Sequence, residues 1–104
     1  MTALVTGAAK RLGRAMALRL AEHGHDVVVH YSGSVEAAQT TAAEIRALGR
    51  RAEVLQADLT VEAEMQALLP AAAQSIGQPI TVLINNASIF EYDTLQTATR
   101  DLSL

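Results

Sequence analysis

The sequence contains no cysteine, no tryptophan, one phenylalanine and a single lysine among its 104 residues. Without cysteine the chain can form neither a disulfide bond nor a thiolate metal site, which is typical of a reducing compartment, and we expect a cytoplasmic protein. His23 and His25 flank Gly24 on a predicted surface loop, and no acidic or thiol residue accompanies them at metal-ligand spacing, so we expect no metal site.

Positive charge and long apolar runs are also scarce. The net charge is −3, and no basic cluster exceeds that of Lys10, Arg11 and Arg14, which argues against nucleic acid or an anionic membrane as the main partner. No apolar run approaches the ~20 residues of a membrane-spanning helix. Half of the residues are apolar, which is enough for the core of one domain. We therefore expect a single domain with a small-molecule partner.

Short apolar strands alternate with amphipathic helices along the chain. The pattern predicts strands at about residues 2–6, 26–31, 51–57 and 80–85, and helices at about residues 12–23, 35–48 and 61–76. Gly24 and Gly49 are expected to end the first two helices. Ser34 and Thr60 are candidate N-caps, and Pro70 should kink the third helix because it lacks a backbone donor. The apolar face of the first helix is expected to comprise Leu12, Ala15, Met16 and Leu20.

This alternation predicts an α/β fold with a doubly wound, Rossmann-like parallel sheet and the strand order 3-2-1-4. The order reverses between the first and fourth strands, and ligands bind at the carboxyl ends of the strands at such a point. The turn after the first strand and the segment after Asn85 would then share one crevice.

The turn after the first strand reads Thr-Gly-Ala-Ala-Lys-Arg-Leu-Gly, from Thr6 to Gly13. Gly7 lets the chain leave the strand tightly, and Gly13 lets the following helix pack closely on the sheet. Backbone N–H groups at the start of that helix could bind phosphate. Arg11 stands where such turns usually have a middle glycine, so an ordinary strand-to-helix turn is the alternative.

Three segments together resemble the short-chain dehydrogenase/reductase family. They are the glycine turn, the pair Asp58-Leu59 after the third strand, and Asn85-Asn86-Ala87-Ser88 after the fourth. The resemblance implies a dinucleotide-binding domain and a set of cofactor-binding residues, namely Gly7, Lys10, Arg11, Leu12, Gly13, His30, Tyr31, Ser32, Asp58, Leu59, Asn86, Ala87 and Ser88. For Asp58 the alternative is a plain turn residue before the Thr60 cap.

Within that family, Arg11, the pair His30-Tyr31 and the segment from Asn85 to Phe90 look like the pteridine reductase branch. The resemblance implies that Arg11 contacts cofactor phosphate and a pterin, that Ser88 holds both, and that Phe90 stacks on the pterin ring. Two alternatives stay open. Arg11 could be a surface residue that begins a helix, and Phe90 could be a core residue that covers the end of the sheet.

The residues after the second strand favour NADP over NAD. An NAD site usually has an acidic residue there, and this chain reads His30-Tyr31-Ser32-Gly33-Ser34 instead. Lys10, Ser32 and Ser34 could bind the 2′-phosphate, although the resemblance would place an arginine near Gly33. The alternatives are that Ser34 only caps a helix and that Lys10 is only solvated.

No catalytic residue is identified in the chain. The family uses a Tyr-x-x-x-Lys pair, but Tyr31 and Tyr92 are followed four positions later by Val35 and Gln96. We therefore expect residues 1–104 to be the cofactor-binding half of an NADP-dependent reductase, incomplete after the fourth strand and inactive alone. A longer form is expected to be a homo-oligomer. The alternative is a non-catalytic nucleotide-binding or interaction module.

Overall fold

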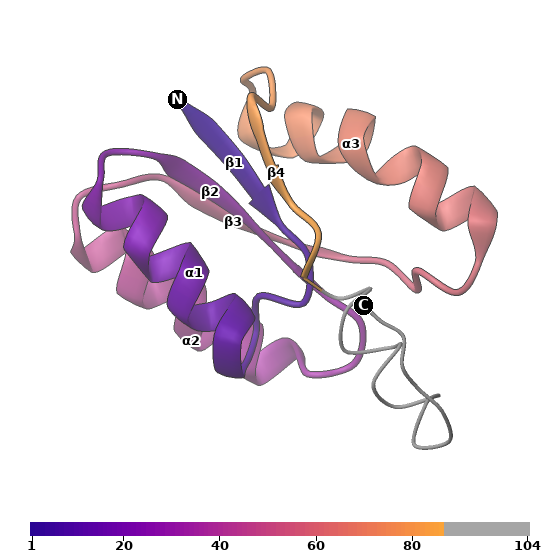
Figure 1. The fold of residues 1–104 in the computed structure, drawn as a ribbon, viewed down its shortest axis with the longest axis horizontal. Helices are drawn as coiled ribbons and strands as arrows, with labels where there is room; N and C mark the ends of the chain where they lie inside the picture. The colour runs from indigo at the N-terminus through magenta and orange to yellow at the C-terminus, as the bar shows by residue number, and fades with distance from the viewer. Residues whose placement is uncertain (87–104) are drawn as a thin grey trace.

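The computed structural model describes residues 1–86, which form a layered α/β unit (Figure 1). Strands and helices alternate strictly along the chain. In order they are β1 (Thr2–Val5), α1 (Arg11–Glu22), β2 (Asp26–Tyr31), α2 (Val35–Ala47), β3 (Ala52–Gln56), α3 (Glu62–Ile76) and β4 (Val82–Ile84).

The four strands form one parallel sheet in the order β3-β2-β1-β4, as the sequence predicted. Leu4 of β1 lies opposite Val28 of β2 and Leu83 of β4, which fixes the register of the central strands. The strands β2 and β3 lie on one side of β1, and β4 lies on the other. The strand order therefore reverses between β1 and β4, and a ligand is expected at the carboxyl ends of these two strands.

Alternate residues of the strands face two separate cores, because successive side chains of a strand point to opposite faces. Val5, Val27 and Val29 pack on one face against alanines of α1 and α2, while Leu4 and Val28 pack on the other against α3. Figure 1 shows the same layers, with α1 and α2 on one side of the sheet and α3 on the other.

The buried face of α1 differs from the prediction. Gly13, Ala17 and Ala21, which are spaced by four residues, lie against the sheet, whereas the side chain of Leu12 is 54% exposed. Small side chains let a helix approach a sheet closely, so they occupy the line of closest contact and the larger residues lie at its margins. Leu18 and Leu20 are accordingly only partly buried.

The helix ends agree with the sequence in some places and not in others. Gly24 and Gly49 have positive φ angles of 95° and 86° just after α1 and α2, as predicted. The prediction of Thr60 as an N-cap is wrong, because Val61 occupies that position and Thr60 binds Asp58 instead. Ser34 is at the N-cap position of α2, but its side chain makes no capping hydrogen bond.

The third helix contains Pro70 and continues through it to Ile76. The strand β2 has the predicted bounds, whereas β1, β3 and β4 are one or two residues shorter than expected at an end, most clearly β4. None of the helices within residues 1–86 combines the length and the apolarity that crossing a membrane would take.

A polar network ties the amino ends of the strands together. The Asp26 carboxylate accepts hydrogen bonds from the Arg51 N–H (3.0 Å) and from Nε2 of Gln78 (2.9 Å). Oε1 of Gln78 accepts in turn from the hydroxyl of Thr2. The bond from the Arg51 amide, followed by that from Gln78, lowers the pKa of Asp26 below its ordinary value of 3.8.

Candidate functional site

The glycine turn between β1 and α1 lies where the carboxyl ends of the central strands meet. The Thr6 N–H donates to the carbonyl oxygen of Ile84 (2.9 Å), which joins the start of the turn to β4. Gly7 has a φ of 64°, a left-handed conformation that favours glycine. The turn is therefore built into the sheet edge that the strand order marks as a binding position.

Hydrogen bonds to two other elements, β2 and α2, hold the turn in place. The Gly7 N–H donates to Nδ1 of His30 (3.0 Å), and the Ala8 N–H donates to the His30 carbonyl oxygen (2.9 Å). The hydroxyl of Thr41 in α2 donates to the carbonyl oxygen of Ala9 (3.2 Å). The amides of Gly7 and Ala8 are thus used inside the fold, and a phosphate group would have to bind the amides that follow.

Those following amides belong to the start of α1. Lys10 is at the N-cap position in an extended conformation and makes no side-chain capping bond, and the first helical turn contains no acidic residue. The Arg14 N–H bonds to the Lys10 carbonyl oxygen (3.3 Å), so the amides of Arg11, Leu12 and Gly13 precede the first helical hydrogen bond. Such an uncapped helix start attracts anions through its amides and its dipole.

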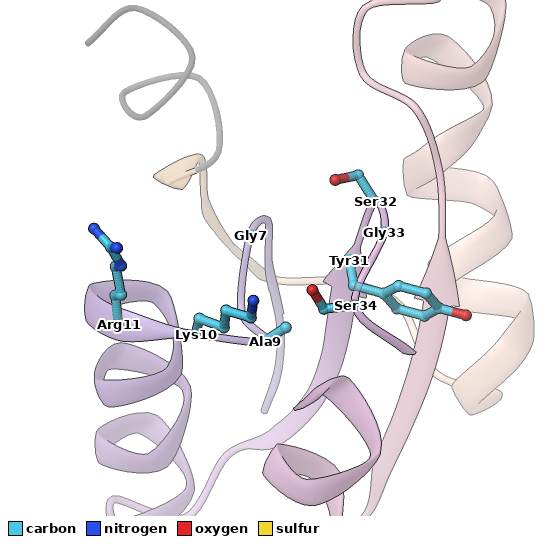
Figure 2. Close-up of a pocket in the computed structure, with 8 residues that line it drawn as sticks. All are labelled: Gly7, Ala9, Lys10, Arg11, Tyr31, Ser32, Gly33 and Ser34. Atoms are coloured by element: carbon cyan, nitrogen blue, oxygen red, sulfur yellow. The ribbon is translucent and has the colours of Figure 1, made fainter. Parts of the chain in front are cut away.

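A cavity of about 190 Å³ adjoins this helix start (Figure 2). In Figure 2, the side chain of Lys10 extends toward Ser34, whereas that of Arg11 points away from the β2–α2 loop. Within residues 1–86, no carboxylate lies on the wall of this cavity, which is lined by Gly7, Ala9, Lys10, Arg11, Tyr31, Ser32, Gly33 and Ser34. A second cavity of about 330 Å³ lies between Lys10 and the start of α2, and Glu36 is on its wall.

His30 does not line either cavity, although the sequence placed it among the cofactor-binding residues. Its side chain is 1% exposed and lies beneath the turn, with Nε2 2.9 Å from the Ala57 carbonyl oxygen. Neighbouring Tyr31 does line the first cavity and also packs against the core.

Asp58 and Leu59 follow β3 at the same edge of the sheet. Oδ1 of Asp58 accepts from the Thr60 N–H (3.0 Å) and from the Thr60 hydroxyl (2.6 Å), and these two bonds lower the pKa of Asp58. Leu59 packs partly buried against the α3 side of the sheet. Asp58 is therefore a turn residue in its bonding, and its contact with an adenine ring stays a prediction.

Asn86 lies beside the glycine turn and is 1% exposed. Its Nδ2 donates to the Gly7 carbonyl oxygen (3.3 Å), and within residues 1–86 its buried Oδ1 has no hydrogen-bond partner. A buried acceptor of this kind fits a site that a polar ligand completes. The predicted site residues Ala87, Ser88 and Phe90 lie outside the described residues.

The structure thus brings Gly7, Lys10, Arg11, Tyr31 and Ser32 around one cavity and places Asp58 and Leu59 at another point of the same edge. The roles of His30 and Thr41 in holding the turn were not predicted from the sequence. A polar residue directly after the apolar run Val27-Val28-Val29 was the one available signal for the buried His30. In the part of the chain that the structure describes, no three histidine, aspartate or glutamate side chains gather as metal ligands would.

Curated relatives include a 3-oxoacyl-(acyl-carrier-protein) reductase from Staphylococcus aureus, which is 41% identical over 88 residues. That alignment covers 85% of this chain and 35% of the relative, so the chain spans about a third of the length of the relatives it matches.

Solved structures share both fold and sequence with the chain. The FolM alternative dihydrofolate reductase 1 from Brucella suis, crystallised with NADP, is 38% identical with a TM-score of 0.74, over 82% of this chain and 34% of that one. A dehydrogenase from Burkholderia cenocepacia with bound NADP is 40% identical with a TM-score of 0.75, over 81% of this chain and 32% of that one. The model of the short chain dehydrogenase family matches residues 1–103, and this chain belongs to that family.

Proposed function

We propose that residues 1–104 form the dinucleotide-binding part of an NADP-dependent reductase. The observation that carries the proposal is the uncapped start of α1, which opens beside a cavity that Lys10 lines and to which the described residues contribute no carboxylate. The donor set suits a phosphorylated dinucleotide, because helix amides favour a pyrophosphate and an ammonium group favours a further phosphate. The NADP bound to two of the similar structures supports the same cofactor.

The groups at the start of α1, on the cavity wall and after β3 have separate tasks in this proposal. The amides of Arg11, Leu12 and Gly13 bind the pyrophosphate, and Lys10 with the hydroxyls of Ser32 and Ser34 binds the 2′-phosphate. A bound NADPH supplies a hydride to the substrate. The chain itself contributes binding and orientation, with Asp58 and Leu59 placed to contact the adenine end.

The substrate class is a flat carbonyl or imine compound, with a pterin as the specific candidate. The support is the similarity to an alternative dihydrofolate reductase, together with Arg11, Ser88 and Phe90 in the sequence pattern. The similarity to a 3-oxoacyl reductase favours a ketone instead. A titration with a pterin and with a 3-oxoacyl thioester, each beside NADPH, separates the two candidates.

The chain offers no Tyr-x-x-x-Lys pair that could protonate a substrate, so we propose that it binds the dinucleotide without reducing a substrate by itself. The same observation supports the second candidate function, a non-catalytic nucleotide-binding module. NADPH oxidation by the purified 104-residue chain would contradict the proposed lack of turnover.

The test of the cofactor is a calorimetric titration with NADPH and with NADH. We expect NADPH to bind more tightly by about tenfold, the value of one charge-assisted contact. Lys10→Glu should remove the preference, whereas Arg19→Glu, which makes the same charge change in the last turn of α1, should leave it intact. Equal affinities of the unsubstituted chain for both dinucleotides would refute the assignment to NADP.

A further inference from the structure

His30 is a buried histidine whose two ring nitrogens bind opposite parts of the chain. Nδ1 accepts a hydrogen bond from the Gly7 N–H (3.0 Å), and Nε2 lies 2.9 Å from the carbonyl oxygen of Ala57. An acceptor at Nδ1 and a donor at Nε2 require the neutral imidazole with its proton on Nε2. The two bonds together therefore select one tautomer of His30.

The backbone of β2 strengthens the same connection. The His30 carbonyl oxygen accepts from the Ala8 N–H (2.9 Å), and the next carbonyl oxygen, that of Tyr31, accepts from the Ala57 N–H (3.1 Å). His30 and its neighbour thus join the glycine turn to the residue that directly precedes Asp58. These are the two positions proposed above for the phosphate and adenine ends of the dinucleotide.

The bonds to His30 also decide which amides face a ligand. A phosphate group approaching the turn would compete for every backbone N–H in reach, but those of Gly7 and Ala8 are already bound on the sheet side. The amides that follow at the start of α1 are left to bind the anion. The direction of the Gly7 peptide is therefore part of the geometry of the site.

We infer that His30 is a positioning residue for dinucleotide binding, which acts by holding the Gly7 N–H toward the sheet and so aims the start of α1 at the pyrophosphate. This inference rests on the proposed function. His30 itself does not touch the dinucleotide, and its influence passes through the turn. Both bonds contribute to the stability of the fold, and the bond to Gly7 also serves binding.

Two substitutions of His30 each remove one of these hydrogen bonds and keep the other, so their effects can be measured separately. In His30→Asn, Oδ1 takes the position of Nδ1 and can still accept from the Gly7 N–H, while Ala57 loses its donor. In His30→Gln, the longer side chain brings its amide N–H near the position of Nε2 and can still donate to Ala57, while Gly7 loses its acceptor. Both variants lose one buried hydrogen bond, so their losses of melting temperature should be similar.

The affinity for NADPH should differ between the variants. We expect His30→Asn to bind within about threefold of the unsubstituted chain and His30→Gln to bind about tenfold more weakly. Amide hydrogen exchange at Gly7 should be slow in the unsubstituted chain and in His30→Asn but faster in His30→Gln. His23→Asn, in an exposed position at the far end of α1, is the matched control and should change neither quantity.

The nitrogen chemical shifts of the His30 ring provide a measurement without substitution. An unprotonated Nδ1 and a protonated Nε2 in the unsubstituted chain are expected, and the opposite tautomer would overturn the inference.

Equal affinities of the Asn and Gln variants for NADPH would also overturn it. If His30→Gln does not fold, a tenfold loss of affinity in His30→Asn would be sufficient to reject it. If the unsubstituted chain binds no dinucleotide, both the proposed function and this inference fail, whereas normal binding with equal variants rejects the inference alone.

Discussion

Gly13 of α1 lies directly against the carbonyl group of Gly7, so the first turn of the helix touches the end of β1. A side-chain carbon on Gly13 would overlap that carbonyl oxygen and would lie 2.6 Å from Nδ2 of Asn86. The two glycines and Asn86 therefore form one compact unit, which sets the distance between α1 and the carboxyl edge of the sheet.

Gly13→Ala should destabilise the chain by about 3 kcal/mol or more, because the backbone of Gly7 cannot move aside without breaking its bonds to His30 and Asn86. Gly33→Ala is the matched control, since nothing lies within 4 Å of a carbon added there. Urea unfolding measures both free energies of unfolding. A Gly13→Ala variant as stable as Gly33→Ala would show that the helix can shift freely.

Arg11→Gly should stabilise the chain while weakening its binding of NADPH. Arg11 has a φ of 56°, in the left-handed region, which costs a residue with a side chain about 1 kcal/mol or more. Glycine removes that cost and also removes the guanidinium group proposed to contact phosphate. We expect a gain of about 1 kcal/mol in the free energy of unfolding and a several-fold weaker affinity.

Arg11→Ala separates the two effects of that substitution. Alanine also lacks the guanidinium group but keeps a Cβ atom at the same φ angle, so it should weaken NADPH binding without the gain in stability. Thermal unfolding measures the change in stability of the two variants, and calorimetric titration measures their affinity for NADPH. An equal gain in stability from alanine would mean that backbone strain at residue 11 is not the cause.

Asp26 should make the stability of the chain sensitive to acid. Its pKa is lowered in the folded chain, mainly by the Arg51 amide and then by Gln78, so its contribution is fully present above the unfolded value near 3.8. That contribution is lost as the pH falls below this value and through the folded pKa. Asp26→Asn should cost about 1 kcal/mol at neutral pH and flatten the acid part of the stability curve.

Chemical unfolding of the Asp26→Asn variant at a series of pH values between about 2 and 7 tests this expectation, because the carboxylate titrates within that range. Glu22→Gln, which removes an exposed carboxylate at the end of α1, serves as the control and should leave the curve unchanged. A curve that is as steep without Asp26 as with it would assign the acid sensitivity to other groups.

Pro70→Ala should stabilise α3. Proline at this position cannot donate a hydrogen bond to the carbonyl group one turn earlier, and the site is exposed, so alanine should fit without a clash. We expect a gain of about 1 kcal/mol or more in the free energy of unfolding. Gln74→Ala in the same helix should change it by only a few tenths. A loss of stability in Pro70→Ala would show that the proline fits the helix better than alanine does.

Much of the fold followed from the sequence because its signals are local. Apolar runs such as Val27-Val28-Val29 predict buried strands, and a glycine such as Gly24 predicts a helix end. Alternation of the two element types then leaves few topologies, and the order β3-β2-β1-β4 is confirmed. The prediction for the buried face of α1 was wrong, because close packing on a sheet selects small residues such as Gly13, Ala17 and Ala21 rather than large apolar ones.

Less of the candidate site could be predicted from the sequence, because its geometry depends on hydrogen bonds between residues that are far apart along the chain. Gly7 and Lys10 were identified from their place in a local motif. The bond between Gly7 and His30 joins residues 23 positions apart, and no local pattern records it. The bond from Thr41 to Ala9 spans 32 positions and comes from a different helix, so a local motif does not contain it either.

The network of Asp26, Gln78 and Thr2 lies at the amino ends of the strands, and the glycine turn lies at their carboxyl ends. Substitutions that are well separated and share no partner have nearly additive effects on stability. The two ends of this sheet can therefore be engineered independently: reinforcing the Asp26 end offers a way to compensate for variants that weaken the turn, without altering the groups that would meet a nucleotide.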